Sequence, residues 1–185
     1  MHGSLYLTPS DPAQLPDPDV VSAVLGRLGI QGALLSEAPQ KMVRVAGEGF
    51  TRHVIYAGCS PHLRFEPERP HDRAFCHLAL LGPYPEPAVV TGENTVNPRC
   101  PRCRARLSDW QQQLHTGQLS CPGCGATSAA WEVDWRQHAA SGRYLIELRN
   151  VFPGEASPSD QLISALQEET GMTWSYAWSG MSPEP

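Results

Sequence analysis

The sequence predicts an α+β fold in which an antiparallel-rich sheet carries two helices and is interrupted by a cysteine-rich insert. Two observations lead to this prediction. Each end of the chain shows the same order of a strand, a loop, a capped helix that ends at a glycine, and a return to a strand. Between these ends, four of the six cysteines lie in two Cys-x-x-Cys pairs. With 185 residues, of which 41% are hydrophobic, the chain can bury a core of its own.

The first half of the chain begins with a short strand at residues 5–7, which is followed by a helix. Asp17 is a typical N-cap residue, and Pro18 then occupies the first helical position. Valines and leucines follow at helical spacing, and Gly29 is placed to end the helix. The prediction is a short amphipathic helix.

A β-hairpin is predicted next. Residues 41–45 and 52–57 alternate between apolar and polar side chains, as half-buried strands do. The segment Gly47-Glu48-Gly49 separates them and suits a tight connection. Residues 59–72 are rich in proline and charge and are expected to form a loop, and the most apolar strand candidate, residues 74–81, follows this loop.

The second half repeats the order of the first. A strand is predicted at residues 144–148, and Ser157-Pro158 is expected to cap a helix over residues 159–170 that ends at Gly171. A last strand is predicted at residues 174–178. A split βαβ arrangement resembling ferredoxin-like folds accommodates this order, and an α+β sheet with helices on one face is the alternative.

The expected organisation is one α+β domain in two parts, with an insert between them. Three prolines between residues 83 and 87 mark the approach to the insert. The N-terminal part covers residues 1–94, the insert covers residues 95–136, and the C-terminal part covers residues 137–178. Residues 179–185 are expected to form a disordered tail.

The most informative part of the insert is a pair of cysteine turns, Cys100-Pro101-Arg102-Cys103 and Cys121-Pro122-Gly123-Cys124-Gly125. A Cys-x-x-Cys turn lets two thiolates reach the same cation, while backbone amides hydrogen-bond to the sulfurs. Two such turns complete a tetrahedron. The sequence therefore predicts one metal site with four ligands: Cys100, Cys103, Cys121 and Cys124.

Residues 97–135 resemble the zinc ribbon family, in which two knuckles of this kind hold together a small antiparallel sheet. Arg104 departs from the pattern, because glycine stands at the corresponding place of the second turn, Gly125. We expect one structural Zn²⁺ per chain, since paired four-cysteine turns are the standard structural zinc set and leave no position for a catalytic water. The second turn is also similar to a rubredoxin knuckle, which implies iron and electron transfer. Metal-free cysteines or two disulfides are the remaining alternative.

Charge and composition bear on the partner. The formal net charge of −5 gives a phosphate backbone no overall attraction. In the insert, five arginines exceed three acidic residues, but four thiolates with one divalent cation bring the module close to neutral. We therefore expect a zinc-binding, non-enzymatic protein-interaction module. Nucleic-acid binding through Arg102 and Arg104 is a less favoured alternative, because Trp131 and Trp135 are expected to pack the insert and its junction with the larger domain.

An enzyme is a second alternative, and it depends on histidines and cysteines in the first half of the chain. Cys59 and His62 could pair a thiolate with an imidazole, with His71 or His77 contributing. Cys76 and His77 are adjacent in a predicted strand and should point to opposite faces, so both cannot easily serve one site. Cys76 shares a face with leucines and is expected to be a core residue.

The expected location is the cytoplasm. The sequence has no run of about 18 apolar residues, and its start lacks a basic region followed by an apolar one. Paired cysteines without an export signal favour metal over disulfides, as in a reducing cytosol. The chain is therefore expected to be soluble, with no membrane partner.

Overall fold

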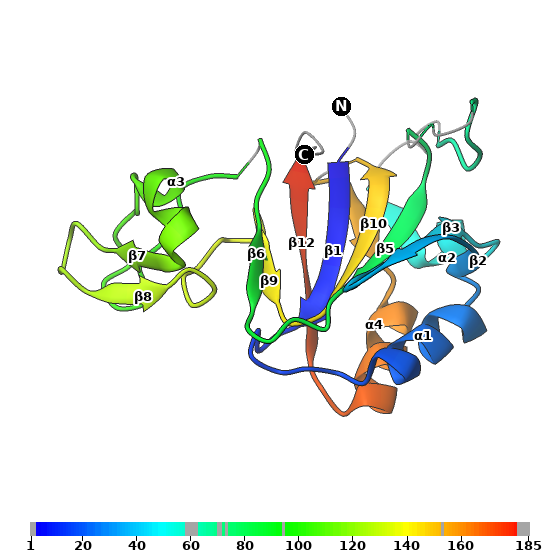
Figure 1. The fold of residues 1–185 in the computed structure, drawn as a ribbon, viewed down its shortest axis with the longest axis horizontal. Coiled ribbons are helices and arrows are strands. Elements are labelled where there is room, and N and C mark those ends of the chain that lie inside the picture. The colour runs from blue at the N-terminus through cyan, green and yellow to red at the C-terminus, as the bar shows by residue number, and fades with distance from the viewer. Residues whose placement is uncertain are drawn as a thin grey trace.

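The fold is built on a six-stranded antiparallel sheet (Figure 1). The computed structural model describes residues 3–57, 63–69, 72, 74–93, 95–152 and 154–180. The strand order is β12-β1-β10-β5-β3-β2, and every neighbouring pair is antiparallel. These strands are β1 (Gly3–Pro9), β2 (Gln31–Ala38), β3 (Lys41–Ala46), β5 (His77–Leu81), β10 (Leu145–Val151) and β12 (Trp174–Gly180). The predicted α+β class is confirmed.

The strand order contains two interlocked split βαβ units. β1 and β5 run in the same direction with β10 between them, and α1 (Pro18–Arg27) lies in the chain that connects them. β10 and β12 also run in the same direction, with β1 between them and α4 (Asp160–Thr170) in their connection. This is the arrangement of ferredoxin-like folds, with the β2–β3 hairpin added beyond β5. The cysteine-rich segment lies in the connection from β5 to β10.

Both predicted long helices are present and lie side by side on one face of the sheet (Figure 1). The Asp17 carboxylate accepts a hydrogen bond from the Asp19 backbone N–H at 2.9 Å, so the predicted cap of α1 is confirmed. Gly171 ends α4 in the left-handed conformation, as predicted. The two helices bury apolar side chains against the strands: Val21, Val24, Leu25, Leu162 and Leu166 from the helices, and Leu5, Leu7, Ile146 and Leu148 from the sheet.

The predicted cap of α4 was wrong by two residues. Ser157 and Pro158 belong to the short strand β11 (Ala156–Pro158), which pairs with β4 (Val54–Tyr56). The N-cap is Ser159, whose hydroxyl oxygen accepts a hydrogen bond from the Leu162 backbone N–H at 3.1 Å. The same oxygen lies 3.0 Å from Nδ1 of His53. Because Ser157 is part of the strand that pairs with β4, the helix begins after Ser159 instead.

The predicted hairpin between residues 41–45 and 52–57 was also wrong. β3 pairs with β2, while Phe50–His53 forms the short helix α2 and only Val54–Tyr56 is a strand, in a different sheet. The Gly47 N–H donates to the carbonyl of Ile30 at 2.8 Å. A Cβ at Gly47 would lie 2.2 Å from the carbonyl oxygen of Gly29. The glycine therefore permits two backbone segments to approach closely, and the turn that begins at its carbonyl, which accepts from the Phe50 N–H at 3.1 Å, leads into α2 instead of closing a hairpin.

The second face of the sheet is covered by the antiparallel pair β6 (Ala88–Val90) and β9 (Ala140–Gly142). Tyr6, Ala140, Leu145 and Ala177 form the small apolar core between this pair and the sheet. The pair leads into the insert, which projects away from the sheet in Figure 1. The insert contains α3 (Trp110–Gln113), a 3₁₀ helix (Leu114–Thr116), β7 (Gln118–Ser120) and β8 (Thr127–Ala129).

The predicted tail, residues 179–185, is corrected at its first two residues. Ser179 and Gly180 are the last two residues of β12, so they do not belong to it, and residues 181–185 lie outside the described residues. Among the described residues, none of the helices has the length and apolar character that crossing a bilayer requires.

The two serines before α4 provide a matched test of the cap. We expect Ser159→Ala to lower the free energy of unfolding by about 1–2 kcal/mol, because the Leu162 N–H then loses its acceptor. Ser157→Ala should have a much smaller effect, since its hydroxyl makes only a 3.5 Å contact with the carbonyl of Ile55. Urea unfolding of both variants measures the difference. Equal losses for the two variants would contradict the assignment of the cap.

A pH effect on stability follows from the His53 side chain, which is only 2% exposed. Burial lowers the pKa of His53 below its ordinary value of 6.5, and the nearby charge of Arg52 lowers it further. The unfolded chain therefore takes up a proton that the folded chain resists, so stability should fall as the pH drops below about 6.5. Urea unfolding between pH 7.5 and pH 5.5 should show a smaller decline for His53→Gln than for wild type. The same substitution at the exposed His115 controls for the loss of a histidine.

Candidate metal centre

The four paired cysteines meet at one point. Their sulfur atoms all lie within 4.8 Å of one another. The Cys103 and Cys121 sulfurs are 3.5 Å apart, and those of Cys100 and Cys124 are 3.8 Å apart. A disulfide needs about 2.05 Å, so these pairs are free thiols. A tetrahedral metal with sulfur ligands at about 2.3 Å places its ligands about 3.8 Å apart, so the cluster has the size that such an ion requires.

The two cysteine turns share one backbone geometry. In the first turn, the Cys100 N–H donates to the Ala105 carbonyl at 2.9 Å and the Arg104 N–H donates to the Cys100 carbonyl at 3.0 Å. In the second turn, the matching bonds run from Cys121 to Ala126 at 2.8 Å and from Gly125 to Cys121 at 2.9 Å. Arg104 has φ +65° and Gly125 has φ +69°. Arg104 thus adopts the left-handed conformation that glycine favours.

The thiols affect one another's ionisation strongly. The backbone N–H of Cys103, together with that of Arg102, lowers the pKa of Cys100 to about 6. The Ala105 N–H acts in the same direction on Cys103, but the neighbouring thiols of Cys121 and Cys124 outweigh it and raise the pKa of Cys103 to about 12. Adjacent sulfurs resist carrying several negative charges together. A cation between them removes this repulsion, so deprotonation and metal binding favour each other.

A small apolar core supports the cluster. Trp110 and Trp135 are buried and meet edge to face, with ring centroids 5.1 Å apart. The indole N–H of Trp135 donates to the Ala130 carbonyl at 2.9 Å. The prediction that Trp135 packs the insert is confirmed, whereas Trp131 is half-buried. The two buried rings are not available as surfaces for stacking bases.

Two of the insert's arginines make contacts within the protein. The guanidinium of Arg104 pairs with the carboxylate of Asp134 at 2.8 Å. Arg136 donates to the Asn97 carbonyl at 3.1 Å. The side chains of Arg102 and Arg106 are exposed. The arginines of the insert therefore serve partly to hold its two ends together.

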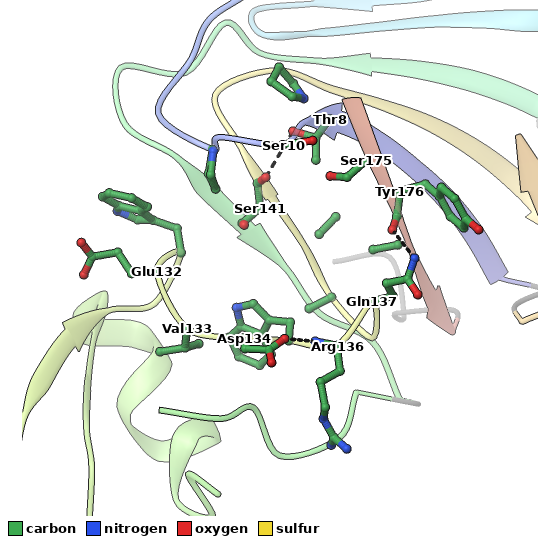
Figure 2. Close-up of a pocket in the computed structure, with 17 residues that line it drawn as sticks. Thr8, Ser10, Glu132, Val133, Asp134, Arg136, Gln137, Ser141, Ser175 and Tyr176 are labelled. Carbon is green, nitrogen blue, oxygen red and sulfur yellow. Dashed lines mark hydrogen bonds between the residues drawn. The ribbon is translucent and has the colours of Figure 1, made fainter. Parts of the chain in front are cut away.

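A cleft of about 510 Å³ separates the end of the insert from the sheet (Figure 2). Ser141 and Ser175 lie on its sheet side, and Glu132 lies on its insert side. A second cleft of about 690 Å³ continues along β12, lined by Ile55, Ile163 and Trp174 among others. Gln137, Ser175 and Tyr176 line both clefts. Nothing in the sequence pattern singled out Gln137, because its contacts are made across the fold.

The structure describes only one residue of the predicted Cys/His centre, His77. Cys59, His62 and His71 lie outside the described residues. Cys76 is buried in the main core, as predicted, and burial raises its pKa to about 12. His77 lies on the opposite face, with Nδ1 2.7 Å from the Phe75 carbonyl oxygen. Cys76 and His77 are therefore not brought together.

A buried polar cluster on β1 and β10 escaped the sequence reasoning. One carboxylate oxygen of Glu147, which is 3% exposed, accepts hydrogen bonds from Ser4 at 2.8 Å and from Tyr6 at 2.7 Å. Its other oxygen lies 2.9 Å from Nε of Arg149. Burial, followed by the charge of Glu147, raises the pKa of Tyr6. In the sequence, Glu147 and Arg149 alternate with apolar residues at the end of a predicted strand, and this pattern could have indicated a buried charged pair.

No family model, curated protein or solved structure matches the chain. The function must therefore be inferred from the geometry of the site. Among the described residues, the four-cysteine cluster is the group whose chemistry most narrowly defines what it can bind.

Proposed function

We propose that this protein binds one structural zinc ion through Cys100, Cys103, Cys121 and Cys124, and that residues 97–135 form a zinc ribbon. The observation that carries the proposal is the set of sulfur separations, 3.5 and 3.8 Å within a cluster that spans 4.8 Å. The matching hydrogen bonds of the two turns support it. Four thiolates fill a tetrahedral shell, so the metal stabilises the fold of the insert and activates no water.

The proposed role of the stabilised insert is to bind another protein in the cytoplasm. Burial of Trp110 and Trp135 removes two of the insert's three tryptophan rings from stacking on nucleic-acid bases, and the third, Trp131, is half-buried. Arg104 and Arg136 are engaged within the protein. A near-neutral module offers a phosphate backbone little attraction, so a protein partner fits the insert better. No catalytic role is proposed, since the four-thiolate shell is closed.

The first test is metal content. We expect elemental analysis to find one zinc per chain, and a strong chelator to lower the thermal midpoint because the insert loses its cross-link. Cys103→Ser and Cys124→Ser should reduce the metal content to near zero. Cys76→Ala should keep one zinc per chain, since this thiol lies in the main core away from the cluster. Absence of zinc from all samples would contradict the proposal, and coloured protein containing iron would turn it toward electron transfer.

The left-handed residues after each turn provide a second test. Gly125→Ala should weaken zinc binding roughly tenfold, because a left-handed Ala costs about 1–2 kcal/mol. No atom lies within 4 Å of a Cβ at this position, so the cost comes from the backbone alone. Arg104→Gly removes a similar cost but also an exposed ion pair worth about 0–1 kcal/mol, so affinity should change by only a few-fold. Competition with a chromophoric chelator measures both variants. If both variants weakened zinc binding by the same factor, the two positions would not share the left-handed conformation on which this prediction depends.

A further inference from the structure

Gln137, the residue that follows the insert, covers part of the outer edge of β12. In the part of the chain that the structure describes, this strand pairs with β1 on one side and with no strand on the other. On its other side, the Gln137 carbonyl accepts a hydrogen bond from the Trp178 N–H at 2.8 Å. The side-chain amide of Gln137 donates to the Tyr176 carbonyl at 3.2 Å, as the dashed line in Figure 2 shows. Gln137 thus satisfies two outward backbone groups that a neighbouring strand would otherwise pair.

The backbone conformation that places Gln137 there is an unfavourable one. Arg136 has φ +52° and Gln137 has φ +64°, although neither residue is glycine. Two consecutive left-handed residues persist only where their surroundings hold them in place. Gln137's own bonds to β12 and a 2.8 Å bond from the Thr95 hydroxyl to the His138 carbonyl contribute to this, and the contacts of the preceding residues also help to keep Gln137 on the edge.

Those contacts lead directly to the cysteine cluster. The residue before Cys100, Arg99, exchanges two backbone hydrogen bonds with Asp134, at 2.9 and 3.0 Å. The residue after Cys103, Arg104, pairs with the carboxylate of Asp134 at 2.8 Å. The other oxygen of this carboxylate accepts from the Arg136 N–H at 2.9 Å. Both ends of the first cysteine turn therefore hold the residues that precede Gln137.

We propose that the insert is a metal-dependent latch on the sheet: while the cysteines hold their metal, Gln137 closes the edge of β12, and loss of the metal releases Gln137 and opens this edge to β12 of a second copy of the chain. This inference rests on the proposed metal site. A metal-free insert lacks the cross-link that orders its first turn. Arg99 and Arg104 then no longer fix Asp134, and the left-handed pair relaxes.

The chemistry of the opened edge favours a second copy as the partner. An unpaired strand edge is a template for another strand, and two β12 strands can pair antiparallel about a twofold axis. The cleft beside this edge is lined by Ile55 and Ile163, and Ile55 is 49% exposed. Pairing with a second β12 strand would cover these apolar side chains and would also give hydrogen-bond partners to the outward N–H and C=O groups of β12.

Amide hydrogen exchange followed by NMR tests the latch. In the metal-bound protein, we expect the Trp178 amide to be protected, and chelation should raise its exchange rate about tenfold or more. The amides of β10, in the centre of the sheet, should keep their protection. The proposal is overturned if the amides of Cys121 and Gly125 lose protection on chelation while that of Trp178 keeps it.

Substitutions at Gln137 separate the latch from the metal. Gln137→Pro cannot adopt φ +64°, so it should keep one metal per chain and still show fast exchange at Trp178. Gln137→Ala removes only the side-chain amide and should raise exchange by a few-fold, which keeps the test informative if the proline variant fails to fold. Gln112→Ala, at an exposed glutamine of α3, is the control and should leave Trp178 protected. Unchanged exchange in Gln137→Ala, with or without a folded proline variant, would count against the latch.

Sedimentation velocity tests the second copy. Metal-free wild type and metal-bound Gln137→Pro should both form dimers that metal-bound wild type does not. Monomers in both samples, with the Trp178 amide exposed, would overturn the pairing of β12 strands. Elemental analysis of the same wild-type sample distinguishes the two failures. If the chain never holds metal, the proposed function is contradicted. If the chain holds metal but chelation does not change the exchange rate of the Trp178 amide, only the latch is contradicted.

Discussion

The antiparallel pairing of β5 with β10 determines where the rest of the molecule lies. Leu81 at the end of β5 pairs with Leu145 at the start of β10, so the chain leaves the sheet and returns to it at the same point. The pair β6–β9 keeps the two chain segments together beyond this point, with Ala88 opposite Gly142 and Val90 opposite Ala140. An insert whose ends are held side by side adds little loop entropy and can fold without changing the order of the six strands. β9 also covers the face opposite the helices, so β10 is buried on both sides.

The size of the insert explains why its chemistry differs from that of the sheet. The main core draws on helices α1, α2 and α4 and on the central strands, whereas the apolar cluster of the insert has nine buried residues, which include Trp110, Trp135 and, just after the insert, Ala139. A module of this size buries too little apolar area to offset the ordering of its backbone, and the proposed metal cross-link would supply the difference. The buried sulfurs of Cys100 and Cys121 belong to the same cluster as the tryptophans. In this proposal the core and the metal site are therefore one structure.

Sequence reasoning succeeded where the signal was local and failed where tertiary contacts chose between local signals. Asp17 and Gly171 mark helix ends through their own backbone and side-chain chemistry, so both were predicted correctly. Ser157 and Ser159 are both good caps, and only pairing with β4 decides between them. Gly47 begins a turn, as its sequence suggests, but this turn leads into a helix, and the close approach to Gly29 is a tertiary contact. The cysteines could be grouped from spacing, whereas Glu147 and Gln137 act on strands far away in sequence.

The two edges of the sheet are protected by different means, and the difference follows from chain order. At β2, register shifts between Gln31 and Ser36 interrupt the ladder within a local hairpin, so the protection forms together with the strand. Among the described residues β12 is the last strand, and the contacts on its outer edge come from earlier parts of the chain. Two of its outward N–H groups donate hydrogen bonds: that of Trp174 to the side chain of Gln167, and that of Trp178 to the carbonyl of Gln137. Gln167 lies on α4 and Gln137 follows the insert, so in the proposed latch the closing of one part of this edge depends on whether a distant module is folded.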